Sequence, residues 1–274
     1  MITSLRNEKV RLVRALQTRR KVRLREGCFV IEGIRLGEEA VRAGAVPRFV
    51  LYTAAAHMDE RAAALIATWT EAEIPCYEVS EEVMEACSAT ETPPGLLAVV
   101  PIPSNPSPAE PTFVLVVDRV RDPGNLGTIL RTALAAGVDW VTLAPGTVDP
   151  TNPKVVRAGA GAHFRLPVAR MGWEAIGRAV TGCRVYLAAA RGERPYTEID
   201  WSGRIALVVG GEAAGAGERA RALAETTVFI PMAPGVESLN VAVATGVLLF
   251  EAMRQRGIYA GKTAASHETD VRSR

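Results

Sequence analysis

The chain has 274 residues, of which 48% are hydrophobic, and this length is sufficient for two domains with separate cores. No run approaches the roughly 18 consecutive apolar residues of a membrane helix, and the N-terminus lacks the apolar core of a signal peptide, so we expect a cytoplasmic protein without membrane contact. The four cysteines are far apart and form no CxxC pair, which argues against a metal site or a disulfide framework.

The net charge of +2 is unevenly distributed. Residues 1–25 carry nine Lys or Arg against one acid, Glu8. Such a segment attracts a polyanion, and neutralisation of phosphates would make binding salt-dependent. The basic run Arg19, Arg20, Lys21 and Arg23 is therefore a candidate polyanion contact, the alternative being a solvated basic helix.

Residues 1–100 alternate between helical and strand-like patterns, which is typical of a small α/β domain. Helical spacing is found at 5–20, 35–43 and 59–70, and a further capped helix begins at Ser80. Short apolar runs predict strands at 28–31, 49–52, 76–79 and 96–100.

A linker follows at 101–111, with five prolines in eleven residues. Beyond it we expect a parallel-sheet α/β domain over 112–259 and a disordered tail over 260–274. Its predicted strands are 113–117, 141–144, 165–168, 185–189, 205–209 and 227–230, and a long helix is predicted over 239–255.

The first motif of this domain, over 122–138, is a Gly-rich turn after a buried strand that opens a helix, with Asn125 in the turn and Arg131 one helical turn beyond Gly127. It is neither GxGxxG nor a P-loop, and a capped turn with a surface arginine is the alternative. A second motif, over 207–217, ends a strand with glycines that let backbone approach a flat ligand, and Glu212 is its only charge.

A third motif, over 230–244, joins an apolar strand, a Pro and Gly turn, and Ser238 and Asn240 at a helix start. An ordinary helix cap is the alternative. Residues 152–164 predict a helix that carries Lys154 and Arg157 on one face, either as phosphate contacts or as exposed charges. His163 is interpreted as structural.

The three segments NLGTILRTALAAG, LVVGGEAAGAG and IPMAPGVESLNVAVATGVLLFEAMRQR, in this order, resemble the motifs of the SpoU/TrmH family of RNA ribose 2′-O-methyltransferases, in the SPOUT class. FVIEGIRLGEEAV and TPPGLLAVV give residues 1–100 a weaker similarity to the α/β/α RNA-binding substrate domain of such enzymes, which is similar to kink-turn-binding ribosomal proteins.

This resemblance implies a C-terminal parallel sheet with a deep trefoil knot, a homodimer formed through that domain, and S-adenosylmethionine as cofactor. It assigns cofactor contacts to Gly210, Ile230 and Leu239. It assigns the catalytic surround to Asn125, Arg131, Glu212, Ser238 and Asn240. It also makes the basic residues named above candidate RNA contacts. The family often has Ser at the position of Gly159, so a polar contact beside Arg157 is expected to be missing.

The implied reaction is 2′-O-methylation of a ribose in structured RNA, for which we expect 23S ribosomal RNA. A transfer RNA methyltransferase, a catalytically silent knotted RNA-binding protein and a nucleotide-dependent oxidoreductase are the alternatives. Arg131 is sometimes assigned as the base in this family, but a guanidinium holds its proton too tightly, and binding of the target's phosphate suits it better.

Overall fold

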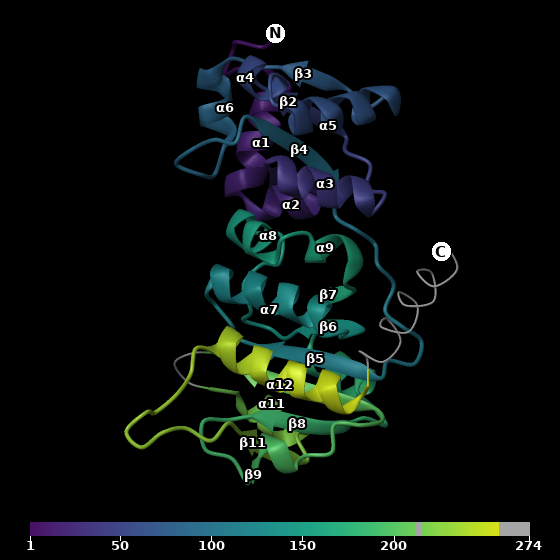
Figure 1. Ribbon diagram of the computed structural model, residues 1–274, viewed down its shortest axis with the longest axis vertical. Helices are drawn as coiled ribbons and strands as arrows, with labels where there is room; N and C mark the ends of the chain where they lie inside the picture. The colour runs from purple at the N-terminus through teal and green to yellow at the C-terminus, as the bar shows by residue number, and fades with distance from the viewer. Residues whose placement is uncertain (212–214, 258–274) are drawn as a thin grey trace, which may run out of the picture. The chain divides into compact units, whose positions relative to one another are not determined.

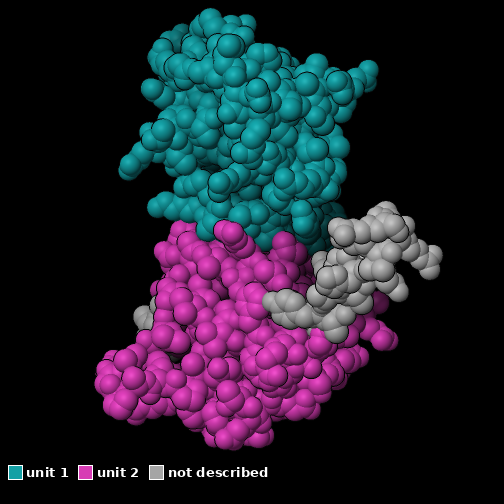
Figure 2. Space-filling view, in the orientation of Figure 1, with its two compact units in different colours: residues 1–105, 149–165 teal, residues 106–148, 166–274 magenta. Residues whose placement is uncertain are grey.

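The computed structural model describes residues 1–211 and 215–257. They form two compact units, which are coloured separately in Figure 2. Unit 1 comprises residues 1–105 and 149–165, and unit 2 comprises 106–148 and 166 onwards. In the described part of the chain, no helix is both long and apolar enough to cross a membrane.

Unit 1 has a central sheet with the strand order β1-β4-β2-β3, in which β4 runs antiparallel to β1 and β2. Its strands are β1 (Cys28–Glu32), β2 (Phe49–Tyr52), β3 (Cys76–Glu78) and β4 (Leu96–Pro101). Its helices are α1 (Glu8–Thr18), α2 (Arg20–Glu26), α3 (Ile34–Arg42), α4 (Ala54–His57), α5 (Glu60–Glu71), α6 (Glu81–Cys87), α8 (Pro153–Gly159) and α9 (Ala162–Arg165).

Alternate residues of these strands enter two separate cores, because successive side chains of a strand point to opposite faces of its sheet. Phe29 and Ile31 of β1 pack with α3 and α5 on one face. Cys28 and Val30 pack with α1 and α6 on the other. The α/β/α layering expected from the sequence is therefore confirmed.

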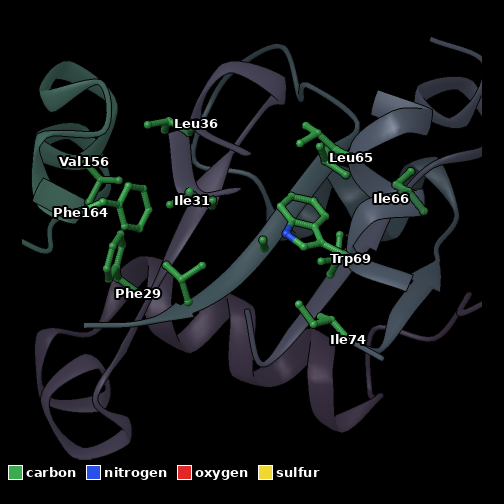
Figure 3. Packing of buried hydrophobic residues seen from close by; sticks show 14 residues of the cluster. Phe29, Ile31, Leu36, Leu65, Ile66, Trp69, Ile74, Val156 and Phe164 are labelled. Carbon is green, nitrogen blue, oxygen red and sulfur yellow. The ribbon is translucent and has the colours of Figure 1, made fainter. Parts of the chain in front are cut away.

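Helices α8 and α9 belong to unit 1 although they follow β6 of the second sheet in the chain. Val156 and Phe164 are buried in the same core as Phe29, and the rings of Phe29 and Phe164 have their centroids 6.1 Å apart (Figure 3). Arg165 also pairs with Glu39 of α3 at 2.7 Å. Residues 149–165 are thus an integral part of the first hydrophobic core, and the boundaries drawn from the sequence stay a prediction.

Unit 2 has a sheet with the strand order β7-β6-β5-β10-β8-β11-β9, and every pairing between these strands is parallel. The strands are β5 (Phe113–Asp118), β6 (Trp140–Leu143), β7 (Val168–Arg170), β8 (Arg184–Ala188), β9 (Arg194–Pro195), β10 (Ile205–Gly210) and β11 (Thr226–Phe229). The helices are α7 (Pro123–Ala135), α10 (Trp173–Ala179), the 3₁₀ turn η1 (Tyr196–Glu198), α11 (Glu218–Leu223) and α12 (Val241–Gln255). Helix α12 crosses the sheet at β10 and packs against α7 (Figure 1).

Three predicted elements differ from the structure. The single helix predicted over 152–164 is divided into α8 and α9, because Ala160 adopts a left-handed backbone conformation that ends α8. The strand expected at 165–168 lies at Val168–Arg170, since Arg165 ends α9 and Pro167 has no N–H to give to a ladder. The helix expected over 5–20 begins after the cap Asn7 and breaks at Arg19, whose backbone is extended.

Candidate functional site

A cavity of about 700 Å³ lies in unit 2 at the carboxyl ends of β8, β10 and β11 and beside the start of α12. Its walls include Leu187, Gly210, Ile230 and Leu239. In open parallel sheets, ligands bind outside the carboxyl ends of the strands, and cavities of this volume accommodate small molecules. This is therefore the candidate ligand site of the unit.

Two glycines at the end of β10 allow the backbone to pass close to its neighbours. A Cβ at Gly210 would lie 2.4 Å from the nitrogen of Ala216, and one at Gly211 would lie 2.4 Å from the carbonyl oxygen of Arg119. Such contacts are too short for any side chain. The glycines of the second motif are therefore required for this packing, in addition to any approach to a ligand.

Asp118 and Arg119, which the sequence motifs did not single out, hold the segment after β10. Asp118 is 1% exposed, and one of its carboxylate oxygens accepts the N–H of Gly217 at 2.7 Å. Arg119 adopts a left-handed conformation (φ 54°) and donates to the carbonyl oxygen of Gly215 at 3.3 Å. A carboxylate at the end of the otherwise apolar strand FVLVVD was the signal that could have identified this anchor.

Asn240 joins the start of α12 to the first motif. Its Oδ1 accepts the N–H groups of Ala242 and Val243, so Asn240 is the N-cap of α12. Its Nδ2 donates to Oδ1 of Asn125 at 3.0 Å, across 115 residues of sequence. The structure therefore brings these two predicted catalytic residues into direct contact.

The N-terminus of α7 is capped by Asp122, whose carboxylate accepts the N–H of Asn125 at 2.8 Å. A carboxylate of the chain itself therefore takes the place at which the sequence suggested an anion could bind. Asn125 is the third residue of this helix rather than its cap, which places its side chain next to α12.

Some of the predicted site residues line the cavity and others do not. Gly210, Ile230, Ser238, Leu239 and Asn240 all line the cavity. Asn125 reaches it through Asn240, whereas Arg131 is exposed on α7 and is not part of the lining. Glu212 lies outside the described residues, as does the tail predicted to be disordered. Arg191 and Arg221 also line the cavity, although no sequence motif pointed to them.

The candidate polyanion contacts of unit 1 have different surroundings. Arg19 and Lys21 are exposed, and the half-exposed Arg20 lies 4.0 Å from Asp149. Arg23 is 3% exposed, because its guanidinium pairs with Asp149 at 2.7 Å and donates to the carbonyl oxygen of Leu16 at 2.7 Å. Its donors therefore face the protein interior.

Lys154 and Arg157 lie three residues apart on α8, but their surroundings differ. Lys154 is exposed, whereas Arg157 is partly buried 3.9 Å from Glu32. His163 lies in the first core beside Phe29, and its Nε2 lies 2.8 Å from the carbonyl oxygen of Pro150. Burial lowers the pKa of His163, which favours the neutral ring and agrees with a structural role.

Fold and site together define an α/β protein with a parallel sheet, a small-molecule cavity at the carboxyl ends of its strands and a second unit rich in surface arginine. Residues 112–250 match the SpoU rRNA Methylase family, and residues 7–98 match the MRM3-like substrate binding domain. The chain belongs to the SpoU rRNA methylase family.

Its relatives include the 23S rRNA (guanosine(2553)-2′-O)-methyltransferase RlmP of Bacillus subtilis, which is 38% identical over 91% of this chain and 97% of that protein. The mitochondrial rRNA methyltransferase 3 of Homo sapiens is 31% identical over 86% of this chain and 70% of its own length.

Among solved structures, the SpoU methyltransferase AviRb from Streptomyces viridochromogenes in complex with the cofactor AdoMet has a TM-score of 0.82 and 30% identity, over 91% of this chain and 98% of that one. The AdoMet-bound rRNA methyltransferase from Sinorhizobium meliloti has a TM-score of 0.81 and 33% identity, over 92% and 97% of the two chains.

Proposed function

We propose that this protein transfers a methyl group from S-adenosylmethionine to a ribose 2′-hydroxyl of ribosomal RNA, with 23S rRNA as the substrate. The observation that carries the proposal is the convergence of the motifs. The cavity takes Gly210 from the second motif and Ile230 and Leu239 from the third, and Asn240 links it to Asn125 of the first. The names of the relatives, given above, support the substrate class.

The cavity suits S-adenosylmethionine in size and lining. Its volume of about 700 Å³ lies within the range of small-molecule sites, and its apolar walls at Ile230 and Leu239 suit a flat purine ring. Gly210 at the end of β10 lines that space and carries no side chain. When bound, S-adenosylmethionine supplies a methyl group activated by a positive sulfur.

The protein's own residues would bind and orient the RNA. Arg131 is exposed on α7, so its guanidinium is open to bind a phosphate of the target nucleotide in a forked geometry. Ser238 and Asn240 place polar groups at the cavity wall, where they can hold the ribose hydroxyl. The hydroxyl proton would leave to water, with the Ser238 hydroxyl accepting a hydrogen bond from the ribose hydroxyl, because an arginine cannot accept the proton at neutral pH.

The family also suggests features that we include in the proposal. The first is a trefoil knot in unit 2, and the second is a cytoplasmic location, as for a bacterial rRNA-modifying enzyme. The third is a homodimer formed through the region of α12. Val236, Val243 and Phe250 are 50%, 55% and 41% exposed, and exposed apolar side chains of this size favour burial against a second subunit.

The test is transfer of radiolabelled methyl from S-adenosylmethionine to rRNA from cells that lack the enzyme. We expect label in 23S rRNA at one nucleotide whose 3′-phosphodiester resists alkali, because 2′-O-methylation blocks that cleavage. Label in transfer RNA instead would show that the substrate is transfer RNA and not 23S rRNA. Absence of label from every RNA, with a protein that is folded, would refute the activity.

A further inference from the structure

A second cavity, of about 550 Å³, lies in unit 1 between α1 and α2. It exists because Arg19 has an extended backbone (φ −119°, ψ 105°), which ends α1 and lets α2 leave in a new direction. Its lining comes entirely from these helices and the residue between them: Glu8, Arg11, Leu12, Arg14, Ala15, Thr18, Arg19, Val22 and Arg25. We call it the α1–α2 groove.

The groove combines an apolar floor with a basic rim. Leu12 and Val22 are partly buried against the core of unit 1, so their remaining surface forms the floor with Ala15. The arginines of the lining are all exposed and face a single acid, Glu8. Glu8 is itself 3.3 Å from Lys9.

Three of the rim arginines have no anionic partner among the residues that the structure describes. Among the residues that the structure describes, no hydrogen bond or ion pair engages the guanidinium groups of Arg11, Arg14 and Arg19. Arg25, by contrast, pairs with Glu26 at 2.9 Å. Like charges three residues apart on a helix, such as Arg11 and Arg14, destabilise it, so a ligand that supplies negative charge here would relieve repulsion.

Arg23 differs from the rim arginines because its guanidinium has partners within unit 1. Arg23 is one helical turn from Arg19 in sequence, but its guanidinium is satisfied by Asp149, Thr151 and Leu16. Arg23 thus stabilises unit 1 from within α2, whereas Arg19, the residue before α2, and Arg25 line the groove.

We propose that the α1–α2 groove binds the sugar-phosphate backbone of a single-stranded segment of the RNA substrate, with Arg11, Arg14 and Arg19 as the phosphate contacts. The ribose or base of the bound nucleotide rests on the floor formed by Leu12, Ala15 and Val22. Forked guanidinium groups suit phosphate oxygens, and single-stranded RNA is bound by positive grooves with apolar or aromatic floors. The inference rests on the proposed function for the identity of the polyanion, and it adds Arg11 and Arg14 to the contacts.

The experiment measures binding of a radiolabelled 23S rRNA transcript to the full-length protein at several salt concentrations, for wild type and for Arg11→Gln, Arg14→Gln and Arg19→Gln. Glutamine keeps helix propensity and removes only the charge. Arg178→Gln is the matched control, because Arg178 is exposed on α10 and forms no described ion pair or side-chain hydrogen bond. Heat of S-adenosylmethionine binding and methyl transfer are measured for every variant.

Each groove variant should bind the transcript about fivefold more weakly near 0.1 M salt. Each should also lower the slope of log affinity against log salt by about one. The Arg178→Gln control should match wild type, and heat of S-adenosylmethionine binding should be the same in all five proteins. In methyl transfer the groove variants should raise KM for RNA and leave kcat unchanged, because no residue that lines the groove also lines the cavity at Gly210.

Groove variants that match Arg178→Gln in affinity and in salt slope, while wild type methylates the transcript, would overturn the groove and leave the proposed function standing. A second outcome would distinguish the groove proposal from the proposed function. Absence of methyl transfer by wild type, together with weaker RNA binding by the groove variants alone, would refute the proposed function and support the groove.

Discussion

Replacing Arg23 by methionine should destabilise the protein strongly, because the side chain is the centre of a buried polar network. The Arg23 side chain is 4% exposed and the Asp149 side chain 8% exposed, and their closest approach is 2.7 Å. The substitution leaves that carboxylate without its main partner and the carbonyl oxygen of Leu16 without its donor. Breaking a buried pair by removing one member costs about 3–5 kcal/mol.

The structure favours the lower end of that range. The other oxygen of Asp149 keeps the hydroxyl and the N–H of Thr151, and Arg20 at 4.0 Å supplies a second, half-exposed charge. We therefore expect the free energy of unfolding of unit 1 to fall by about 3 kcal/mol, which exceeds the cost of most single substitutions. Urea unfolding of the full chain, followed by circular dichroism, measures the loss.

The control is Arg61→Met, which breaks an exposed ion pair with Glu38 on the same unit, at a similar distance of 2.8 Å. Such surface pairs contribute about 0–1 kcal/mol. Equal losses for the two variants would contradict the structural role of Arg23. An Arg23→Met protein with unchanged stability and weakened RNA binding would instead support the direct RNA contact that the sequence predicted for Arg23.

Three further predictions concern other parts of the chain. Asn240→Asp keeps the cap of α12 and loses the donor to Asn125. We expect kcat to fall at least tenfold while the free energy of unfolding stays within about 1 kcal/mol of wild type. An unchanged kcat would show that the contact with Asn125 has no role in catalysis. Gly210→Ala places a Cβ 2.4 Å from the Ala216 nitrogen and should weaken S-adenosylmethionine binding at least tenfold by calorimetry, whereas Gly177→Ala, with open space around its Cβ, should bind normally; equal affinities would mean that this packing does not shape the cavity. Burial raises the pKa of the Cys87 thiol from 9.0 to about 11, so its contribution to stability is complete below pH 9 and is lost as pH rises to about 11, and Cys87→Ala should flatten that loss; an identical pH profile for the variant would show that another group titrates there.

The third motif was predictable because its pattern is local. A strand, a Pro and Gly turn and a capping residue are read from neighbouring positions, and the structure places Ile230, Leu239 and Asn240 around one cavity. The sequence did not show which residue caps α12, since Ser238 and Asn240 are both good capping residues. In the structure the N-cap is Asn240. Most strands of the parallel sheet followed from their apolar runs. Pro167 shifted β7, and the two-residue strand β9 (Arg194–Pro195) has no apolar run that could have predicted it.

Which basic residues are exposed and which are buried could not be predicted from the sequence. Arg19 and Arg23 look equivalent in sequence, and what separates them is Asp149, which lies 126 residues from Arg23. A single sequence contains no signal for such a long-range pairing. The same holds for Val156 and Phe164, whose burial against Phe29 depends on the fold of the whole of unit 1.

Isothermal titration of the purified full-length protein with S-adenosylmethionine tests the central claim most directly, because the claim is that the sequence motifs meet at one cavity lined by Gly210, Ile230 and Leu239. We predict saturable heat with one site per chain, abolished by competition with S-adenosylhomocysteine. A folded protein that releases no heat with S-adenosylmethionine would contradict the account.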